Sequence, residues 1–233
     1  MPTPFDRRDP LLDTASSQAD TITTADVARY IKERIKRGLF VAGQRMVEID
    51  LSRETGASRA RVREALRALA AEGLITIEAF RGASVKRFDR AEVEQIYQLR
   101  EVLEGLAARL AAVRGEASGK ARIGTLNTEM EALQRSGDRD GYARANEAWH
   151  QAIIAAAANP HLAETLERLR LPMLRFQFQA FYQRSAMADA NADHRAVTTA
   201  VLAGDGDQAE ALMRQHVRGG LREIRSLGDE LFA

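Results

Sequence analysis

The sequence predicts a mainly α-helical protein with two parts. The N-terminal part is a winged helix-turn-helix of three helices and a β-hairpin wing, and the C-terminal part is an all-α helical bundle. The first part is predicted because a helix, a glycine-containing turn and a second helix precede two β-prone segments. The second is predicted because amphipathic helical patterns follow one another beyond Asp89 with no convincing strand.

The N-terminal part is predicted from short apolar patterns and from glycines. From Thr24, apolar residues recur at three- and four-residue steps and indicate an amphipathic helix that ends before Gly38. A loop follows, then two helices separated by Gly56-Ala57-Ser58, then two β-prone segments that form a hairpin, or wing. The later helices are expected at about 47–55 and 59–72, and the strands at 74–77 and 84–88.

The C-terminal part is rich in Ala, Leu, Arg and Glu, and glycine or proline separates its helical patterns. Such a set of amphipathic helices makes an α-bundle with a core of its own. The predicted helices are 91–114, 118–135, 139–158, 160–184, 187–203 and 206–227. Residues 1–24, which hold many Ser, Thr, Asp and Pro, are expected to be a flexible tail.

The composition excludes several kinds of protein. The chain has no cysteine, so a disulfide framework, a Cys-ligated zinc finger, an iron–sulfur cluster and a thiol nucleophile are all excluded. The longest apolar run, residues 152–158, is far shorter than the roughly 20 residues that span a membrane. The N-terminus lacks an apolar signal core. We therefore expect a cytoplasmic protein with no membrane partner.

Charge is distributed unevenly along the chain. The formal net charge of +1, taken alone, argues against a nucleic-acid-binding protein. Residues 26–90, however, hold fifteen Lys or Arg against nine Asp or Glu, whereas residues 91–233 hold seventeen against twenty. The basic charge therefore coincides with the predicted helix-turn-helix and favours a nucleic-acid partner for that part.

The helix predicted at 59–72 carries an arginine-rich face. Val62, Leu66 and Leu69 form its apolar face, so most of its arginines project elsewhere. Ser58 is suited to cap the helix. A basic first turn opposes the helix dipole, so a role other than helix stability must favour arginine there. An arginine fork can bind guanine in the major groove or clamp a phosphate.

These features give a set of candidate DNA contacts on the helix, before it and at the wing tip. The alternative for the helix is an exposed arginine face that only keeps it soluble. For the residues outside the helix, the alternative is an ordinary surface position. The candidates are Arg45, Ser58, Arg59, Arg61, Arg63, Arg67, Arg81 and Gly82.

A long, ordered motif connects these features. It comprises Gly38-Leu39, Gly43-Gln44-Arg45, Leu51-Ser52, residues 56–59, residues 62–66, Glu72-Gly73-Leu74-Ile75 and residues 81–85. The stretch from Ile31 to Val85 that contains it resembles the winged helix-turn-helix of the GntR family of bacterial transcription regulators. The chain has Ala42 where proline is common and Ala60-Arg61 where a Thr-Pro pair is frequent, so the base preference of the family cannot be transferred.

The resemblance continues into the helical part. Residues 97–112 are similar to the opening helix of the FCD effector domain in the FadR-type branch of that family. The resemblance implies a homodimeric transcription regulator, a repressor of a catabolic operon, that binds pseudo-palindromic double-stranded operator DNA and responds to a small organic acid. It divides the chain into a tail at 1–24, a DNA-binding domain at 25–88 and an effector-binding and dimerisation domain at 89–233.

Three of the four histidines form a pattern. His150 lies four residues after Asn146 on one helical face, and His194 and His216 lie on the last two helices. Three imidazoles and an amide oxygen that converge in a bundle could hold Zn²⁺, Ni²⁺ or Mn²⁺. The resemblance implies the same ligand positions, although Asn146 stands where a carboxylate is common. His161 falls outside the pattern, and the alternative for the other three is a role as core residues.

Arg100 and Glu104 lie four residues apart on the first helix of the second domain. They could form an ordinary exposed ion pair. The resemblance implies instead that the arginine faces the cavity that takes a small carboxylate. We hypothesise that the metal and Arg100 bind this acid from two sides. Two other functions stay open: a metal-dependent hydrolytic enzyme that uses the three histidines, and a metal-free dimerisation module. No recognised motif places a carboxylate near the histidines as a general base.

Overall fold

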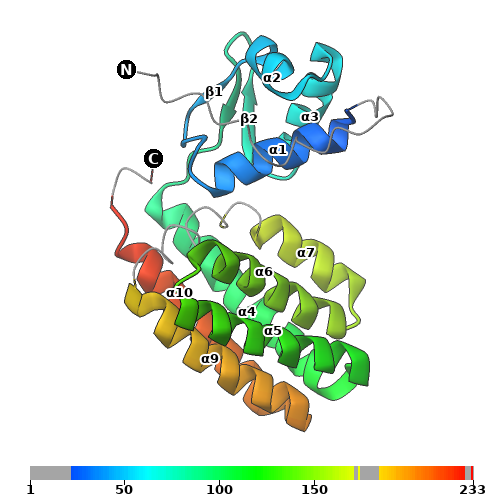
Figure 1. Ribbon diagram of the computed structural model, residues 1–233, viewed down its shortest axis with the longest axis vertical. Coiled ribbons are helices and arrows are strands. Elements are labelled where there is room, and N and C mark those ends of the chain that lie inside the picture. Colours follow the sequence, from blue (N-terminus) through cyan, green and yellow to red (C-terminus); the bar gives the residue numbers. More distant parts are fainter. Residues whose placement is uncertain (1–21, 171–172, 174–183, 229–231, 233) are drawn as a thin grey trace.

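The computed structural model describes residues 22–170, 173, 184–228 and 232, and Figure 1 shows two units at opposite ends of the molecule. The predicted tail, up to residue 21, lies outside the described residues, and so does most of the predicted helix 160–184 beyond residue 170. The first unit contains α1 (Thr24–Lys36), β1 (Arg45–Met46), α2 (Glu48–Thr55), α3 (Arg59–Ala71), β2 (Ile75–Glu78) and β3 (Gly82–Val85).

The three helices of the first unit pack against one another and against a small sheet. Val27 and Ile31 of α1 are fully buried and share a core with Leu69 of α3. Thr23 and Asp26 form a capping box that starts α1. Gly56 ends α2 with a φ of +73°, a left-handed conformation that glycine adopts without strain. The predicted helix-turn-helix is confirmed.

The sheet is antiparallel with the strand order β1-β3-β2, and it differs from the prediction in two ways. The two-residue strand β1 was not predicted, because so short a strand has no period of its own; it pairs Arg45 with Ser84 of β3. The wing strands also lie at 75–78 and 82–85 instead of 74–77 and 84–88. Phe88 does not extend the wing, because its ring is buried with the helices of the second unit.

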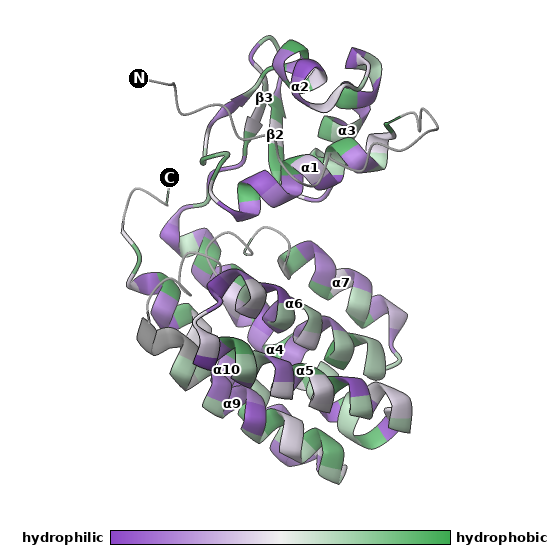
Figure 2. Ribbon diagram, in the orientation of Figure 1, coloured by the Kyte–Doolittle hydropathy of each residue, from purple (hydrophilic) through white to green (hydrophobic). Residues whose placement is uncertain are grey.

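The second unit is the predicted all-α bundle, and its helices lie close to the expected ranges with one exception. Of the predicted helix 160–184 the structure describes a helix only up to residue 170, and Arg184 begins the next described helix. They are α4 (Arg90–Arg114), α5 (Ala117–Ser136), α6 (Arg139–Ala156), α7 (Pro160–Arg170), α9 (Arg184–Ala203) and α10 (Gly206–Arg225). Figure 2 shows that the helices of both units carry hydrophobic and hydrophilic residues together, as helices with one buried face do. None of the described helices is long and apolar enough to cross a membrane.

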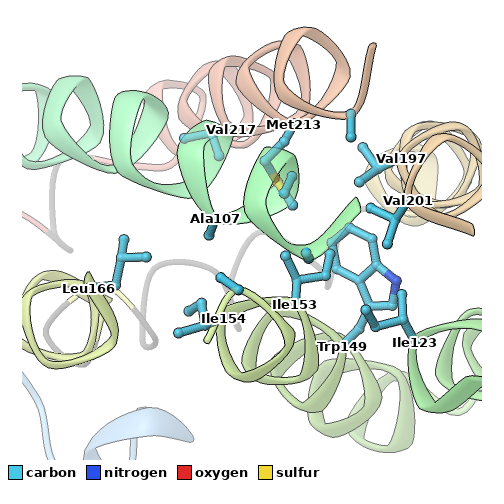
Figure 3. Close-up of a cluster of buried hydrophobic side chains, with 14 of the residues drawn as sticks. Ala107, Ile123, Trp149, Ile153, Ile154, Leu166, Val197, Val201, Met213 and Val217 are labelled. Carbon is cyan, nitrogen blue, oxygen red and sulfur yellow. The ribbon is translucent and has the colours of Figure 1, made fainter. Parts of the chain in front are cut away.

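Small and large side chains alternate in the core of the bundle. Four buried alanines on α4, at 107, 108, 111 and 112, leave room for neighbouring helices to approach. Figure 3 shows side chains from all six helices converging on this region, with Trp149 of α6 close to Ile123 of α5. Trp149 is fully buried, and its indole N–H donates a 3.0 Å hydrogen bond to the hydroxyl of Thr198 on α9. The core therefore fixes α6 and α9, which carry two of the candidate histidines.

Candidate DNA interface and metal centre

The residues of α3 separate into a buried apolar group and an exposed basic group, because one face of the helix packs into the core. Val62, Leu66 and Leu69 are buried as predicted, whereas Arg59, Arg63 and Arg67 are exposed. Ser58 is the N-cap residue, and its hydroxyl accepts from the backbone N–H of Arg61 at 3.4 Å. The first turn of α3 thus begins where the cap was expected, with basic side chains projecting from it.

A groove beside α3 gathers four of the predicted DNA contacts. Arg45, Arg59, Arg63 and Gly82 line it together with Glu48. The pairing of β1 with β3 brings Arg45 next to the wing. Gly82 has a φ of +84° and lies against the guanidinium of Arg45. Residues from three separate elements therefore form one basic surface.

Glu48 lies inside this groove and was not predicted. The guanidinium of Arg63 donates two hydrogen bonds to its carboxylate, from Nε to Oε1 at 2.9 Å and from Nη2 to Oε2 at 2.8 Å. Arg59 Nη2 lies 3.7 Å from the same Oε2. These contacts, led by the hydrogen bond from Arg63, lower the pKa of Glu48, and the charge of Arg67 contributes to the shift. The fork of Arg63 is therefore held by an anion of the protein itself.

The other predicted contacts have different surroundings. Arg61 donates from Nη1 to the backbone carbonyl of Ile22 at 2.9 Å, so its side chain is directed toward the start of α1. Arg81 is exposed at the wing tip, 3.3 Å from Glu78. The sequence made Arg61 a candidate DNA contact but gave no sign of its backbone partner.

The three predicted histidines converge in the bundle. One ring nitrogen of each of His150, His194 and His216 lies within 4.8 Å of the corresponding atoms of the other two. The Nε2 atoms of His150 and His216 are 3.3 Å apart. All three rings lie next to the indole of Trp149, with ring centroids 4.6 to 6.0 Å from it. Asn146 is buried one turn before His150 on α6, and His161 is exposed on α7.

The chemistry of the cluster fits a divalent metal ion. Burial lowers the pKa of His150 to about 4, and burial with the two neighbouring imidazoles holds the pKa of His194 well below its usual value. Both rings are therefore neutral near pH 7, which is the form that binds metals. His194 Nε2 is buried and has no hydrogen-bond partner among the described residues. A buried, unpartnered nitrogen beside two other imidazoles is the arrangement that a metal ligand needs.

Two carboxylates lie beside the histidines although no sequence motif placed them there. Glu104 Oε2 of α4 is 2.8 Å from His150 Nδ1, without the alignment of a full hydrogen bond. Asp193 Oδ2 is 3.7 Å from His216 Nδ1. A carboxylate at Nδ1 favours the proton there and leaves Nε2 free for a metal. The packing of α4 against α6 brings Glu104 to His150, and no spacing in the sequence predicts this contact.

Arg100 and Glu104 form a buried pair, so the alternative of an exposed pair is wrong. Their side chains are 1% and 2% exposed, and Arg100 contacts Glu104 Oε1 through Nε at 2.8 Å and Nη2 at 2.7 Å. The guanidinium also lies over the ring of Tyr97 at 4.5 Å. Burial alone would raise the pKa of Glu104, but the charges of Arg100 and His150 outweigh burial and hold it far below its usual value. One carboxylate thus bridges Arg100 and the histidine cluster.

Two protein families match separate parts of the chain. Residues 23–85 match the family described as "Bacterial regulatory proteins, gntR family", and residues 95–219 match the FCD domain. The first match covers the helices and strands around the basic groove. The second contains Arg100, Glu104 and all three histidines of the cluster.

Two relatives that match over most of their length are named as transcriptional repressors. The HTH-type transcriptional repressor GlaR of Escherichia coli is 30% identical over 206 residues, covering 84% of this chain and 93% of GlaR. The "Probable D-xylose utilization operon transcriptional repressor" of Paenarthrobacter nicotinovorans is 28% identical over 207 residues, covering 88% and 91%. Among solved structures, E. coli McbR/YncC superposes with a TM-score of 0.77 at 20% identity, covering 87% of this chain and 96% of that one, which shows a shared fold.

Proposed function

Because the chain belongs to the GntR family of bacterial transcription regulators and carries an FCD domain, we propose that it represses a catabolic operon and responds to a small organic acid. The single observation that supports this most is the pairing of a basic groove on the first unit with a buried three-histidine cluster in the second. The family consists of regulators and not enzymes, so the hydrolytic alternative is set aside. We place the protein in the bacterial cytoplasm, where its DNA partner lies.

The proposed DNA-binding domain is 25–88. A separate hydrophobic core from Val27 to Val85 supports it, while Phe88 at its end packs with the second unit. In this domain, α3 enters the major groove with Arg59 and Arg63 at its N-terminal turn, as recognition helices do. Arg63 exchanges the carboxylate of Glu48 for a base edge or phosphate. The remaining proposed contacts are Arg45, Ser58, Arg61, Arg67, Arg81 and Gly82.

The proposed sensing domain is 89–233. His150, His194 and His216 would hold a divalent ion, Zn²⁺, Ni²⁺ or Mn²⁺, with the amide oxygen of Asn146 as a fourth, weaker ligand. The ion would supply a Lewis-acidic position for the carboxylate of the effector. Arg100 would bind the same acid, and an acid that reaches it must exchange with Glu104, which now occupies its guanidinium.

We also propose that the protein is a homodimer. Leu99, Val102 and Val113 are exposed along α4, and a second copy of the chain would cover this stripe. Two DNA-binding domains related by a two-fold axis match the two half-sites of a pseudo-palindromic operator. Val102→Glu should therefore yield a monomer in analytical ultracentrifugation, and a dimer of unchanged stability would contradict this interface.

The test of the function uses a duplex recovered by in vitro selection with the wild-type protein. Small carboxylates are first screened by thermal shift, with and without Zn²⁺, Ni²⁺ or Mn²⁺. An acid that raises the melting temperature of the metal-loaded protein should also change its affinity for the duplex. If no acid does both, the sensing proposal fails.

The metal-free alternative is tested separately. Elemental analysis of untagged protein should find a bound transition metal, and His150→Ala should remove it, whereas His161→Ala should not. Protein without metal, together with a His150→Ala variant of unchanged stability, would favour a plain dimerisation module.

A further inference from the structure

Phe80 at the tip of the wing has an unusual conformation. The tripeptide 79–81 connects β2 to β3, whose last paired residues are Glu78 and Gly82. Phe80 has a φ of +62°, and its relative exposure is 106%. The other exposed large hydrophobic side chains of the described residues range from 40% to 64%. The ring therefore projects into solvent from a turn that glycine would occupy without strain.

This placement does not serve the folding of the free protein. A bulky residue in the left-handed region is strained. An exposed phenyl ring also gains no hydrophobic stabilisation. Strain of this kind is found where a side chain must be presented to a ligand.

The tip continues the basic groove. Gly82, two residues after Phe80, lines the groove with Arg59 and Arg63, and Arg81 lies between Phe80 and Gly82. When α3 occupies the major groove, a hairpin that extends beyond the groove meets the neighbouring backbone and minor groove. Arginine suits the phosphates there, and an apolar ring suits the edges of sugars and bases.

We propose that Phe80 packs its ring into the minor groove of the operator, beside the half-site that α3 reads. This inference rests on the proposed docking of the basic groove on DNA. It assigns an apolar contact to a residue for which the charge pattern of the sequence gave no signal. Phenylalanine is among the side chains that act as wedges against base steps in the minor groove.

Two substitutions test the contact without threatening the fold. Phe80→Gly suits the positive φ, and Phe80→Ala removes the ring from an exposed turn. On the selected duplex, both variants should bind at least about fivefold more weakly than wild type. The slope of log affinity against log salt concentration should stay unchanged in both variants, because the ring carries no charge. Arg81→Ala should instead reduce the magnitude of this slope by about 0.9. The matched control is Val41→Ala, because Val41 is another exposed apolar residue of this unit.

The minor groove is tested by changing the DNA. Replacing single adenines that flank the half-site with 2,6-diaminopurine adds an amino group in the minor groove and leaves the adenine groups of the major groove in place. At one position or more, this change should weaken the binding of the wild-type protein at least about fivefold, while the affinity of Phe80→Gly should change by less than about twofold. Equal losses for both proteins at every position would overturn the proposal.

The outcomes also separate this inference from the proposed function. If Arg63→Ala loses affinity while Phe80→Ala and Phe80→Gly bind within about twofold of wild type, the contact by Phe80 is refuted and the docking of α3 stands. If Arg63→Ala also binds as wild type does, the proposed docking itself is wrong.

Discussion

The two units hold their arginines in opposite ways. In the first unit the side chain of Arg63 is 52% exposed and bonded to Glu48, whereas in the second Arg100 is 1% exposed and bonded to Glu104. Both are arginine–carboxylate contacts at normal distances. Exposed pairs are worth about 0 to 1 kcal/mol, but separating a buried pair leaves a desolvated charge. Arg63 can thus change partners readily, while Arg100 can do so only if another anion replaces Glu104.

Breaking the buried pair should have the largest effect. Arg100→Ala leaves the buried carboxylate of Glu104 without its arginine and beside His150, which is neutral near pH 7, and should lower the free energy of unfolding by about 3 to 5 kcal/mol. Urea unfolding measures this. Arg168→Ala breaks an exposed pair with Glu164 on α7 and should change stability by less than about 0.5 kcal/mol. Equal effects of the two substitutions would contradict the contrast between the units.

Replacing the carboxylate that touches His150 should weaken the metal site. Glu104→Gln removes the negative charge at His150 Nδ1 and should lower the affinity for Zn²⁺ about 10- to 100-fold. Isothermal titration calorimetry of the metal-free protein measures it. Glu101→Gln on the same helix, whose carboxylate pairs with Arg218, is the control. An unchanged zinc affinity would show that Glu104 serves Arg100 alone.

Removing the exposed arginine should affect DNA binding and not stability. Arg63→Ala should cost about 1 to 3 kcal/mol of binding to the selected duplex at fixed salt, as expected for a bidentate contact. Fluorescence anisotropy measures it, with Arg29→Ala on α1 as the control. A large loss of folding stability in Arg63→Ala would mean that the pair with Glu48 stabilises the fold, as the buried pair of Arg100 does.

The smallest expected effect concerns the anion in the groove. Glu48→Gln removes a negative charge beside Arg59 and Arg63, so the protein should bind random duplex DNA more tightly. The slope of log affinity against log salt concentration should steepen by up to about 0.9. Asp50→Asn makes the same charge change on α2, next to Arg53. The idea of an exchangeable anion fails if Glu48→Gln and Asp50→Asn have the same slope.

The sequence predicted what local patterns determine. Glycines and caps marked the helix ends, and the apolar face of α3 identified its exposed arginines. The convergence of His150, His194 and His216 is confirmed. The sequence could predict it because each histidine lies on a helix of one bundle. The contacts of Glu48 with Arg63 and of Glu104 with His150 could not be predicted, because they join different elements through packing alone. The strand β1 was missed for the same reason, since its partner strand defines it.

The start of α4 is attached to both units, so a tilt of this helix would displace the first unit relative to the second. Lys86 N–H bonds to the carbonyl of Leu74 at the base of the wing, and Phe88 is buried in the bundle just before α4 begins at Arg90. From Arg100 to Arg90 the helix is about 15 Å long, so a tilt of 5° around Arg100 moves its first residue by about 1.3 Å. Spin labels at single introduced cysteines can measure this displacement cleanly, because the chain has no cysteine of its own.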